Sequence, residues 1–333
     1  MTTVVNDLSA AAAGRGEAGG GEAGGRRRSW PPWRGHGLSE SLLGYAFIGP
    51  ALGLFAVMGA YTIARGFALS FAEWNGFTPN WVWVGIDNYL DLLWRDPAYA
   101  PAVQEAARNT LWVLIAVPLL TIAVSFPLAV LLNSVRRFRA VLRSVYFLPH
   151  VTAGIAIYFA WQYILEPDGA INLVLGSVGL GSLEQPQGFL GNPDTALPTL
   201  IIVTVWTTAP VAMLLYLTGL QAIDSSVTEA AQIDGAGWWR TNLSVVWPLL
   251  NGMTLVVLLL QVRHALQSFE VFLIMTNGGP GEATNVLGLE TYRLAFQSDM
   301  RATLGMSSAL GWMLFVVALI VALVNQRLLR SRT

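Results

Sequence analysis

Polar side chains occur in the middle of two apolar stretches of this sequence, where a hydrocarbon environment makes them costly. In chain order they are Trp206, Thr207, Thr208, Gln261, His264 and Ser268. The last three are spaced i, i+3 and i+7, so they share one face if that stretch is helical. Amide, hydroxyl and imidazole groups beside an aromatic ring suit a hydroxyl-rich ligand. The alternative is that these groups only join neighbouring helices through hydrogen bonds.

A polar segment lies between these two stretches and has a pattern of its own. Its distinctive residues are Glu229, Ala230, Ala231, Asp234, Gly235 and Arg240. Ser226 with Glu229 fits a capping box, and Gly235 fits a helix end. Capping does not account for the paired alanines, the glycine at a fixed distance and Pro248 at the start of the next apolar stretch. The segment therefore needs a second explanation.

The composition indicates a protein that crosses a membrane several times. The chain has 333 residues, of which 54% are hydrophobic and only 12% are charged. It has no cysteine, which excludes disulfides, thiolate metal sites and cysteine nucleophiles. All 19 basic residues are arginine, so there is no lysine for the phosphate loop of an ATPase or for a Schiff base. We expect no catalytic residues, no metal site and no bound cofactor.

Six apolar stretches are long enough to cross a bilayer core of about 30 Å, which takes about 20 helical residues. They cover approximately residues 42–64, 110–132, 144–165, 198–220, 247–269 and 304–324. Residues 1–37 are rich in Gly, Ala and Arg without an apolar run, so we expect a disordered tail. The predicted fold is all-α, with residues 38–333 as one transmembrane domain and residues 221–246 as a loop between the fourth and fifth spans.

The positions of the arginines predict the orientation, because cytoplasmic flanks of membrane helices collect basic residues. Thirteen arginines fall in the tail, in the loops after the second and fourth spans and at the C-terminal end, whereas four fall in the opposite loops. Both termini and the Glu229 segment are therefore expected to be cytoplasmic. We expect a multi-pass protein of a bacterial plasma membrane.

The Glu229 segment resembles a known docking motif. Glu229-Ala230-Ala231, followed by Gly235, Val245 and Trp247-Pro248, is similar to the EAA loop of binding-protein-dependent ABC importers. Membrane subunits of these importers use that loop to dock onto their ATPase. Val245 and Trp247 replace the usual Ile and Leu, but both remain apolar.

Other features extend the resemblance over nearly the whole chain after residue 40. The order of six spans, the Thr276-Asn-Gly-Gly-Pro280 turn and the Tyr292-Arg-Leu-Ala-Phe296 run are similar to the sugar permeases of the maltose and glycerol-phosphate type. Arg143-Ser-Val-Tyr-Phe-Leu-Pro149 is also similar to that family's start of the third span.

The resemblance implies the fold of a type I ABC importer permease, with the Glu229 segment as its coupling helix. It also implies three kinds of protein partner: a second permease that forms a heterodimer, two ATPase subunits that bind the ATP, and an extracytoplasmic solute-binding protein. The transported substrate would be a sugar, more readily a di- or oligosaccharide than an anion. No nucleic acid is implied.

In that family, sugar contacts within the membrane come from the fourth and fifth spans. The matching positions here include all the polar candidates except Trp206, and also Val211 and Ala265, which are poor hydrogen-bonding residues. Arg263 is offset from the polar face, so we expect a partner subunit or backbone carbonyls around it. His150 beside Pro149 is assigned no role.

Two alternatives from other classes remain open. An ion-coupled carrier would need groups to bind or relay the ion, and the six apolar stretches contain no Asp or Glu. Carbonyl oxygens alone could still bind an ion. A polytopic membrane enzyme would need paired carboxylates or a His/Asp cluster at one membrane face, and the sequence offers neither.

Overall fold

The structure is a computed structural model that describes residues 38–135, 137–152, 154–297 and 303–330. The predicted tail, residues 1–37, lies outside the described residues. The chain divides into two units, with Tyr61 as the last residue of the first and Thr62 as the first residue of the second. Both candidate sites discussed below lie entirely in the second unit.

The described part of the first unit, from residue 38 onward, is one helical run. Helix α1 covers Leu38–Leu54 and continues through a π-helical turn, Phe55–Ala60, into α2, Tyr61–Leu69, which belongs mostly to the second unit. Residues Tyr45–Leu69 are long and apolar enough to cross a membrane.

The second unit is almost entirely helical in the part of the chain that the structure describes. Its one small sheet is a hairpin of β1, Ala72–Glu73, and β2, Val82–Trp83, paired antiparallel. The remaining helices are α3 (Asp87–Leu90), α4 (Ala100–Ser134), α5 (Arg139–Val151), α6 (Gly154–Ile164), α7 (Ala170–Ser177), α8 (Pro193–Ala222), α9 (Ser225–Ile233), α10 (Trp238–Arg240), α11 (Trp247–Leu249), α12 (Asn251–Gln267), α13 (Glu270–Met275), α14 (Leu287–Phe296) and α15 (Leu304–Arg330).

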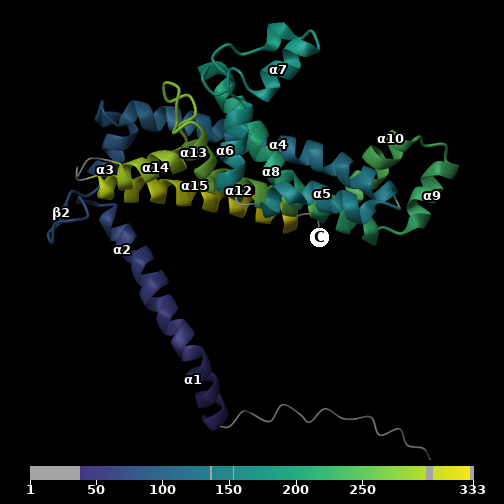
Figure 1. The fold of residues 1–333 in the computed structure, drawn as a ribbon. Helices are drawn as coiled ribbons and strands as arrows, with labels where there is room; N and C mark the ends of the chain where they lie inside the picture. The colour runs from purple at the N-terminus through teal and green to yellow at the C-terminus, as the bar shows by residue number, and fades with distance from the viewer. Residues whose placement is uncertain (1–37, 136, 153, 298–302, 331–333) are drawn as a thin grey trace, which may run out of the picture. The chain divides into compact units, whose positions relative to one another are not determined.

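The helices α4 and α8 form the centre of this unit and lie side by side (Figure 1). Val203 and Leu200 of α8 pack with Phe272 of α13 in one buried cluster, and Met213 and Tyr216 pack in another. The polar segment α9–α10 lies at the opposite end of this unit from α3 and β2 (Figure 1). Buried apolar side chains on both halves of α8 therefore hold this helix in place within the unit, and the candidate site is built against it.

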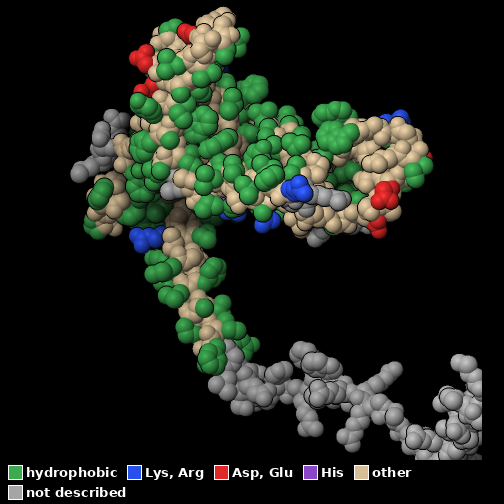
Figure 2. All heavy atoms as spheres, turned by 45° about the vertical axis from the view of Figure 1, so that its right-hand side comes forward, with side chains coloured by type: hydrophobic (Ala, Val, Ile, Leu, Met, Phe, Trp, Pro, Cys, Tyr) green, Lys and Arg blue, Asp and Glu red, His purple; other side chains and the backbone are tan. Residues whose placement is uncertain are grey.

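Four described helices are long and apolar enough to span a membrane, and the count rises to six if each of two bent helix pairs is one span. The predicted all-α membrane fold is confirmed. Figure 2 shows hydrophobic side chains over much of the visible surface of the helical unit, with the visible acidic side chains toward its ends. A lipid environment accounts for that distribution.

Two of the predicted spans coincide with the bent pairs. The stretch 144–165 falls on α5 and α6, whose axes differ by 93°. In the stretch 247–269, helix α12 begins only at Asn251, after a 75° bend from the preceding helical segment. Leu250 lies at the bend with φ −87° and ψ 11°, outside the α-helical region, which ends one helix and starts the next.

Candidate functional site

A cavity of about 400 Å³ is lined by residues of α5, α6, α8 and α12. Its polar side chains are His150, Thr152, Tyr158, Thr207, Thr208, Gln261, Arg263, His264 and Gln267. Apolar groups complete the wall, among them Ile157, Val211 and Leu260. An open cavity with hydroxyl, amide, imidazole and phenol groups can bind a polar organic molecule, which fits the hydroxyl-rich ligand expected from the sequence.

Gln261 is the most buried polar residue of this wall, with 5% of its surface exposed. Its Oε1 atom is buried and has no hydrogen-bond partner among the described residues. A buried amide oxygen without a partner is costly, by about 1–3 kcal/mol. Gln261 lines the cavity as a residue, but this oxygen is closed to solvent, so a ligand can donate to it only after the Gln261 side chain turns toward the cavity.

The two threonines of α8 make local hydrogen bonds. Thr207 Oγ1 and Thr208 Oγ1 each donate to the carbonyl oxygen of Thr204 at 2.9 Å. Each hydroxyl still has lone pairs with which to accept from a ligand. Thr208 Oγ1 also lies 3.4 Å from Thr121 Oγ1 on α4. This hydrogen bond joins two helices, which is the alternative role considered for these polar groups in the sequence analysis.

Trp206 and Ser268 do not line the cavity with the other four candidates. Trp206 is 41% exposed and packs edge to face against Trp161 of α6, with ring centroids 5.3 Å apart. Ser268 follows the last residue of α12 and has extended backbone angles, φ −76° and ψ 103°. The shared helical face expected for Gln261, His264 and Ser268 therefore ends before Ser268.

Five polar residues of the cavity had no substrate role in the sequence analysis, namely His150, Thr152, Tyr158, Arg263 and Gln267. His150 and Tyr158 come from α5 and α6, and only the folding of those helices against α8 and α12 brings them in. Arg263 Nε donates to Gln267 Oε1 at 3.1 Å, one turn further along the helix. Arg263 was expected to meet a partner subunit or backbone carbonyls, whereas its described contact is a side-chain amide.

The polar segment between α8 and α12 is organised by local hydrogen bonds. The carboxylate of Asp224 accepts from the Ser226 backbone N–H at 2.9 Å and caps α9. The helix therefore begins at Ser225, and Ser226 is not the cap. The proposed capping box of Ser226 and Glu229 is replaced by the Asp224 cap, because an Asp one residue before the helix is as good an acceptor.

Two hydrogen bonds with Ser226 lower the pKa of Asp224 below its usual value. The bond from the Ser226 backbone N–H has the larger effect, and the bond with the Ser226 side chain has the smaller one. The cap is therefore charged at neutral pH. A negative charge at this position also suits the positive end of the helix dipole.

The C-terminal end of α9 has the hydrogen bonds of a Schellman motif. Gly235 N–H donates to the Gln232 carbonyl at 3.0 Å, and Ala236 N–H donates to the Ala231 carbonyl at 2.9 Å. Gly235 has φ +77°, while a Cβ added to it would meet nothing within 4 Å. The requirement for glycine is therefore conformational and not steric.

The outward face of this segment combines charged and large apolar groups. Glu229, Ala230, Asp234 and Arg240 are exposed, whereas Ala231 is buried with 8% of its surface exposed. Ile233 is 86% exposed, and Trp238 and Trp239 are 50% and 66% exposed. Large apolar side chains gathered on a polar segment of this kind are typical of a surface that another protein covers.

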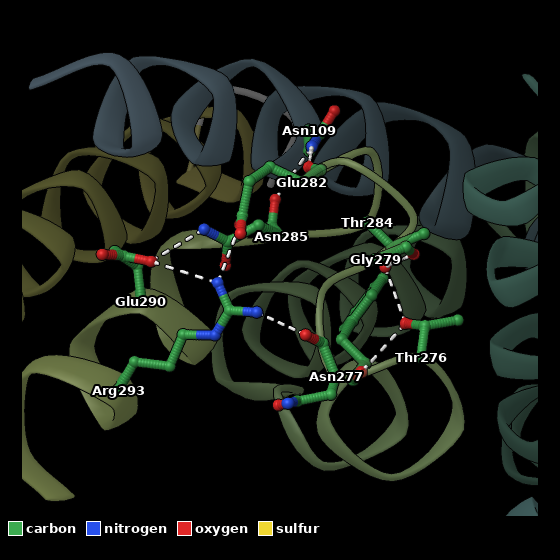
Figure 3. A network of polar contacts seen from close by, with 10 residues as sticks. Asn109, Thr276, Asn277, Gly279, Glu282, Thr284, Asn285, Glu290 and Arg293 are labelled. Atoms are coloured by element: carbon green, nitrogen blue, oxygen red, sulfur yellow. Dashed lines mark hydrogen bonds and ion pairs between the residues drawn. The ribbon is translucent and has the colours of Figure 1, made fainter. Parts of the chain in front are cut away.

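A second polar network lies in the loop between α13 and α14 (Figure 3). Arg293 Nη1 donates to Glu282 Oε2 at 2.7 Å, and Nη2 donates to the Asn277 carbonyl. Asn109 of α4 donates to the Asn285 carbonyl at 2.9 Å, which attaches the loop to the first half of α4. The loop is thus held in one conformation by side chains from α4 and α14.

Among the residues that the structure describes, no group of three or more His, Cys, Asp or Glu side chains is placed to hold a metal ion. The site consists of uncharged polar groups and Arg263.

A family model described as a binding-protein-dependent transport system inner membrane component matches residues 101–333. The trehalose/maltose transport system permease protein MalF of Thermococcus litoralis is 32% identical over 295 residues, which is 88% of this chain and 95% of that protein. The probable ABC transporter permease protein YesP of Bacillus subtilis is 30% identical over 288 residues, which is 86% of this chain and 89% of that protein.

A solved structure has the same fold. It is the crystal structure of a bacterial alginate ABC transporter in complex with an alginate pentasaccharide-bound periplasmic protein. One of its chains matches with a TM-score of 0.72 at 24% sequence identity, over 89% of this chain and 96% of that chain. This similarity confirms the predicted permease fold.

Proposed function

The chain belongs to the family of inner membrane components of binding-protein-dependent transport systems and is a permease subunit, not an enzyme; we propose that its substrate is a neutral di- or oligosaccharide. Family membership favours this class over the ion-coupled carrier and the membrane enzyme. The relative from Thermococcus litoralis is named for trehalose and maltose, which supports a sugar.

The observation that carries the substrate site is the unpaired amide oxygen of Gln261 in the wall of the cavity. Once the Gln261 side chain has turned toward the cavity, a sugar hydroxyl can donate to that oxygen, and sugar hydroxyls can also donate to the Thr207 and Thr208 hydroxyl oxygens. His264 offers a ring nitrogen from α12, beside Gln261, and His150 offers one from α5. Tyr158 and Ile157 supply surface for the apolar CH groups of a sugar ring.

The test is uptake of radiolabelled maltose, trehalose and other neutral disaccharides by the assembled transporter, with the combined Gln261→Ala and His264→Ala variant. Each lost hydrogen bond to a neutral hydroxyl is worth roughly 0.5–1.5 kcal/mol, so each change weakens apparent affinity by a few fold to about tenfold. We expect altered affinity or an altered range of sugars, with normal assembly.

Ser125→Ala is the matched control. Ser125 is also fully buried, and its side-chain oxygen has no hydrogen-bond partner among the described residues. It does not line the cavity. If the double variant transports every sugar with the kinetics of the control, Gln261 and His264 do not contact substrate. Failure to assemble would instead assign them to contacts between helices.

The exposed face of α9 and α10 is the surface that docks onto the ATPase. Glu229 and Arg240 supply charges there, and Ile233, Trp238 and Trp239 supply apolar contact area. ATP binds to the ATPase and not to this chain. The complete transporter contains a second permease in a heterodimer, two ATPase subunits and an extracytoplasmic solute-binding protein.

This arrangement requires α9 to face the cytoplasm, with both chain termini on the same side. Reporter fusions after Arg139 and Arg332 should give cytoplasmic signals, and a fusion after Asp194 should give an external one. A cytoplasmic signal at Asp194 would contradict the topology.

A further inference from the structure

A second cavity, of about 450 Å³, lies between α5 and α8. Its polar residues are Arg143, Ser144, Thr218 and Gln221, and Phe147, Leu214 and Leu217 complete its wall. No function described above uses it. Thr218 lies four residues from the end of α8, on the side of the α9 segment.

The two cavities follow one another along the same pair of helices. The α8 residues that line them recur at alternating spacings of four and three: Thr207 and Val211 in the first, then Leu214, Thr218 and Gln221 in the second. On α5, Arg143 and Phe147 line the second cavity and His150 lines the first, with spacings of four and three again. Residues at these spacings share one helical face.

This face of α8 is open although most of the helix is buried. None of the five α8 residues in the series is buried, whereas Thr208, Met213 and Leu217 beside them are. Three of the five, Thr207, Thr218 and Gln221, are polar. If this face of α8 contacted only lipid, those three polar side chains would not stabilise the helix in the membrane.

Phe147 lines the second cavity and contacts a residue that lines the first. Its ring contacts the His150 ring, with centroids 5.3 Å apart, and it is only partly exposed. Leu214 of α8 lines the second cavity one turn beyond Val211, which lines the first. Phe147 and Leu214 are therefore the bulky apolar residues of the second cavity that come next along α5 and α8 to the first cavity, which is where a hydrophobic constriction would lie.

We propose that the second cavity is the cytoplasmic section of the substrate path, and that Phe147 and Leu214 form the constriction between it and the Gln261 cavity. This inference rests on the proposed function. Ser144, Thr218 and Gln221 offer single hydrogen bonds to a sugar hydroxyl, which are weak enough to let the sugar leave. The second permease completes the wall along the open face of α8.

The chain has no cysteine, so single-cysteine variants can be tested without first removing native thiols. The probe is 2-sulfonatoethyl methanethiosulfonate, a membrane-impermeant anion that reacts with thiolates. It is added to the cytoplasmic side of vesicles that contain the assembled transporter. Leu131→Cys is the matched control, because Leu131 is 54% exposed and lies three residues from the end of α4, much as Thr218 lies four residues from the end of α8.

We expect Thr218→Cys and Gln221→Cys to react at least about tenfold faster than Leu131→Cys, because a thiol in a wet cavity ionises and one in lipid does not. Equal rates for Thr218→Cys and the Leu131→Cys control would overturn the proposal, since lipid or a partner helix would then fill the groove.

The constriction has its own test. Val211→Cys should react slowly from the cytoplasmic side, and adding Phe147→Ala should raise that rate, whereas adding Phe138→Ala should not. Phe138 is 65% exposed and does not line either cavity. An unchanged rate with Phe147→Ala would contradict the constriction. These rates involve no sugar, so they are independent of the uptake experiment that tests the proposed substrate.

Discussion

The Gln261 cavity and the α9 segment are built by different means. Every hydrogen bond that shapes the ends of α9 joins residues within five positions of each other, from the Asp224 cap to the Schellman motif at Gly235. The cavity instead takes residues from four helices, with His150 and Gln261 more than 100 positions apart in the sequence. The shape of the α9 segment is therefore specified locally, whereas the Gln261 cavity depends on how the whole unit packs.

The largest effect should come from reversing the charge at the docking surface. Glu229 is exposed and is not a cap, so Glu229→Lys should leave α9 folded. Like charges placed together at an interface cost several kcal/mol, so uptake and co-purification of the ATPase should fall by about a hundredfold or more. The control is Glu166→Lys, at an exposed acid in a different loop. Retention of both activities by Glu229→Lys would remove the docking role.

The next effect separates the shape of the segment from its chemistry. Gly235→Ala forces a Cβ into the left-handed region, which costs roughly 1–2 kcal/mol. Hydrogen exchange at the Ala236 amide should speed up by about tenfold, since 1.4 kcal/mol corresponds to a factor of ten. Gly237→Ala is the control, because Gly237 has φ −68° and open space around it. Equal exchange in the two variants would show that the turn does not need its glycine.

In the cavity, a single substitution should change binding and stability in opposite directions. Gln261→Leu removes the buried oxygen that has no partner among the described residues, so thermal stability should stay the same or rise. Apparent affinity for the transported disaccharide should fall by a few fold to about tenfold. A loss of stability together with unchanged affinity would assign Gln261 to packing.

The smallest effect concerns the cap of α9. Because the folded-state pKa of Asp224 is lowered, its contribution to stability is present above the unfolded pKa of about 3.9 and is lost as the pH falls through the folded value. Asp224→Ala should therefore increase hydrogen exchange in the first turn of α9 at neutral pH, and Asp224→Asn should retain the cap. Exchange in Asp224→Asn should also show no acid dependence from this site, and an acid transition that persists there would assign it to another group.

The positions of the spans could be predicted because bilayer thickness sets the length of an apolar helix. The predicted stretches 110–132, 198–220 and 304–324 lie within α4, α8 and α15. The bend at Leu250 was not predicted, because hydropathy measures apolar content and not direction. Hydropathy also did not predict that α12 ends at Gln267, which places Ser268 outside the polar face of that helix.

The sequence by itself determined the class of protein, the apolar spans, the C-terminal end of α9 at Gly235 and the four cavity residues on α8 and α12, whereas it placed the N-terminal cap of α9 at Ser226 and not at Asp224. These features depend on composition, on periodicity and on hydrogen bonds between near neighbours, all of which can be read along one segment. Only the tertiary structure decided that His150 and Tyr158 join Gln261, and that Phe147 of the second cavity contacts His150 of the first. Those contacts result from the packing of α5 and α6 against α8 and α12, and the direction of one helix relative to another is set by side chains distant in sequence.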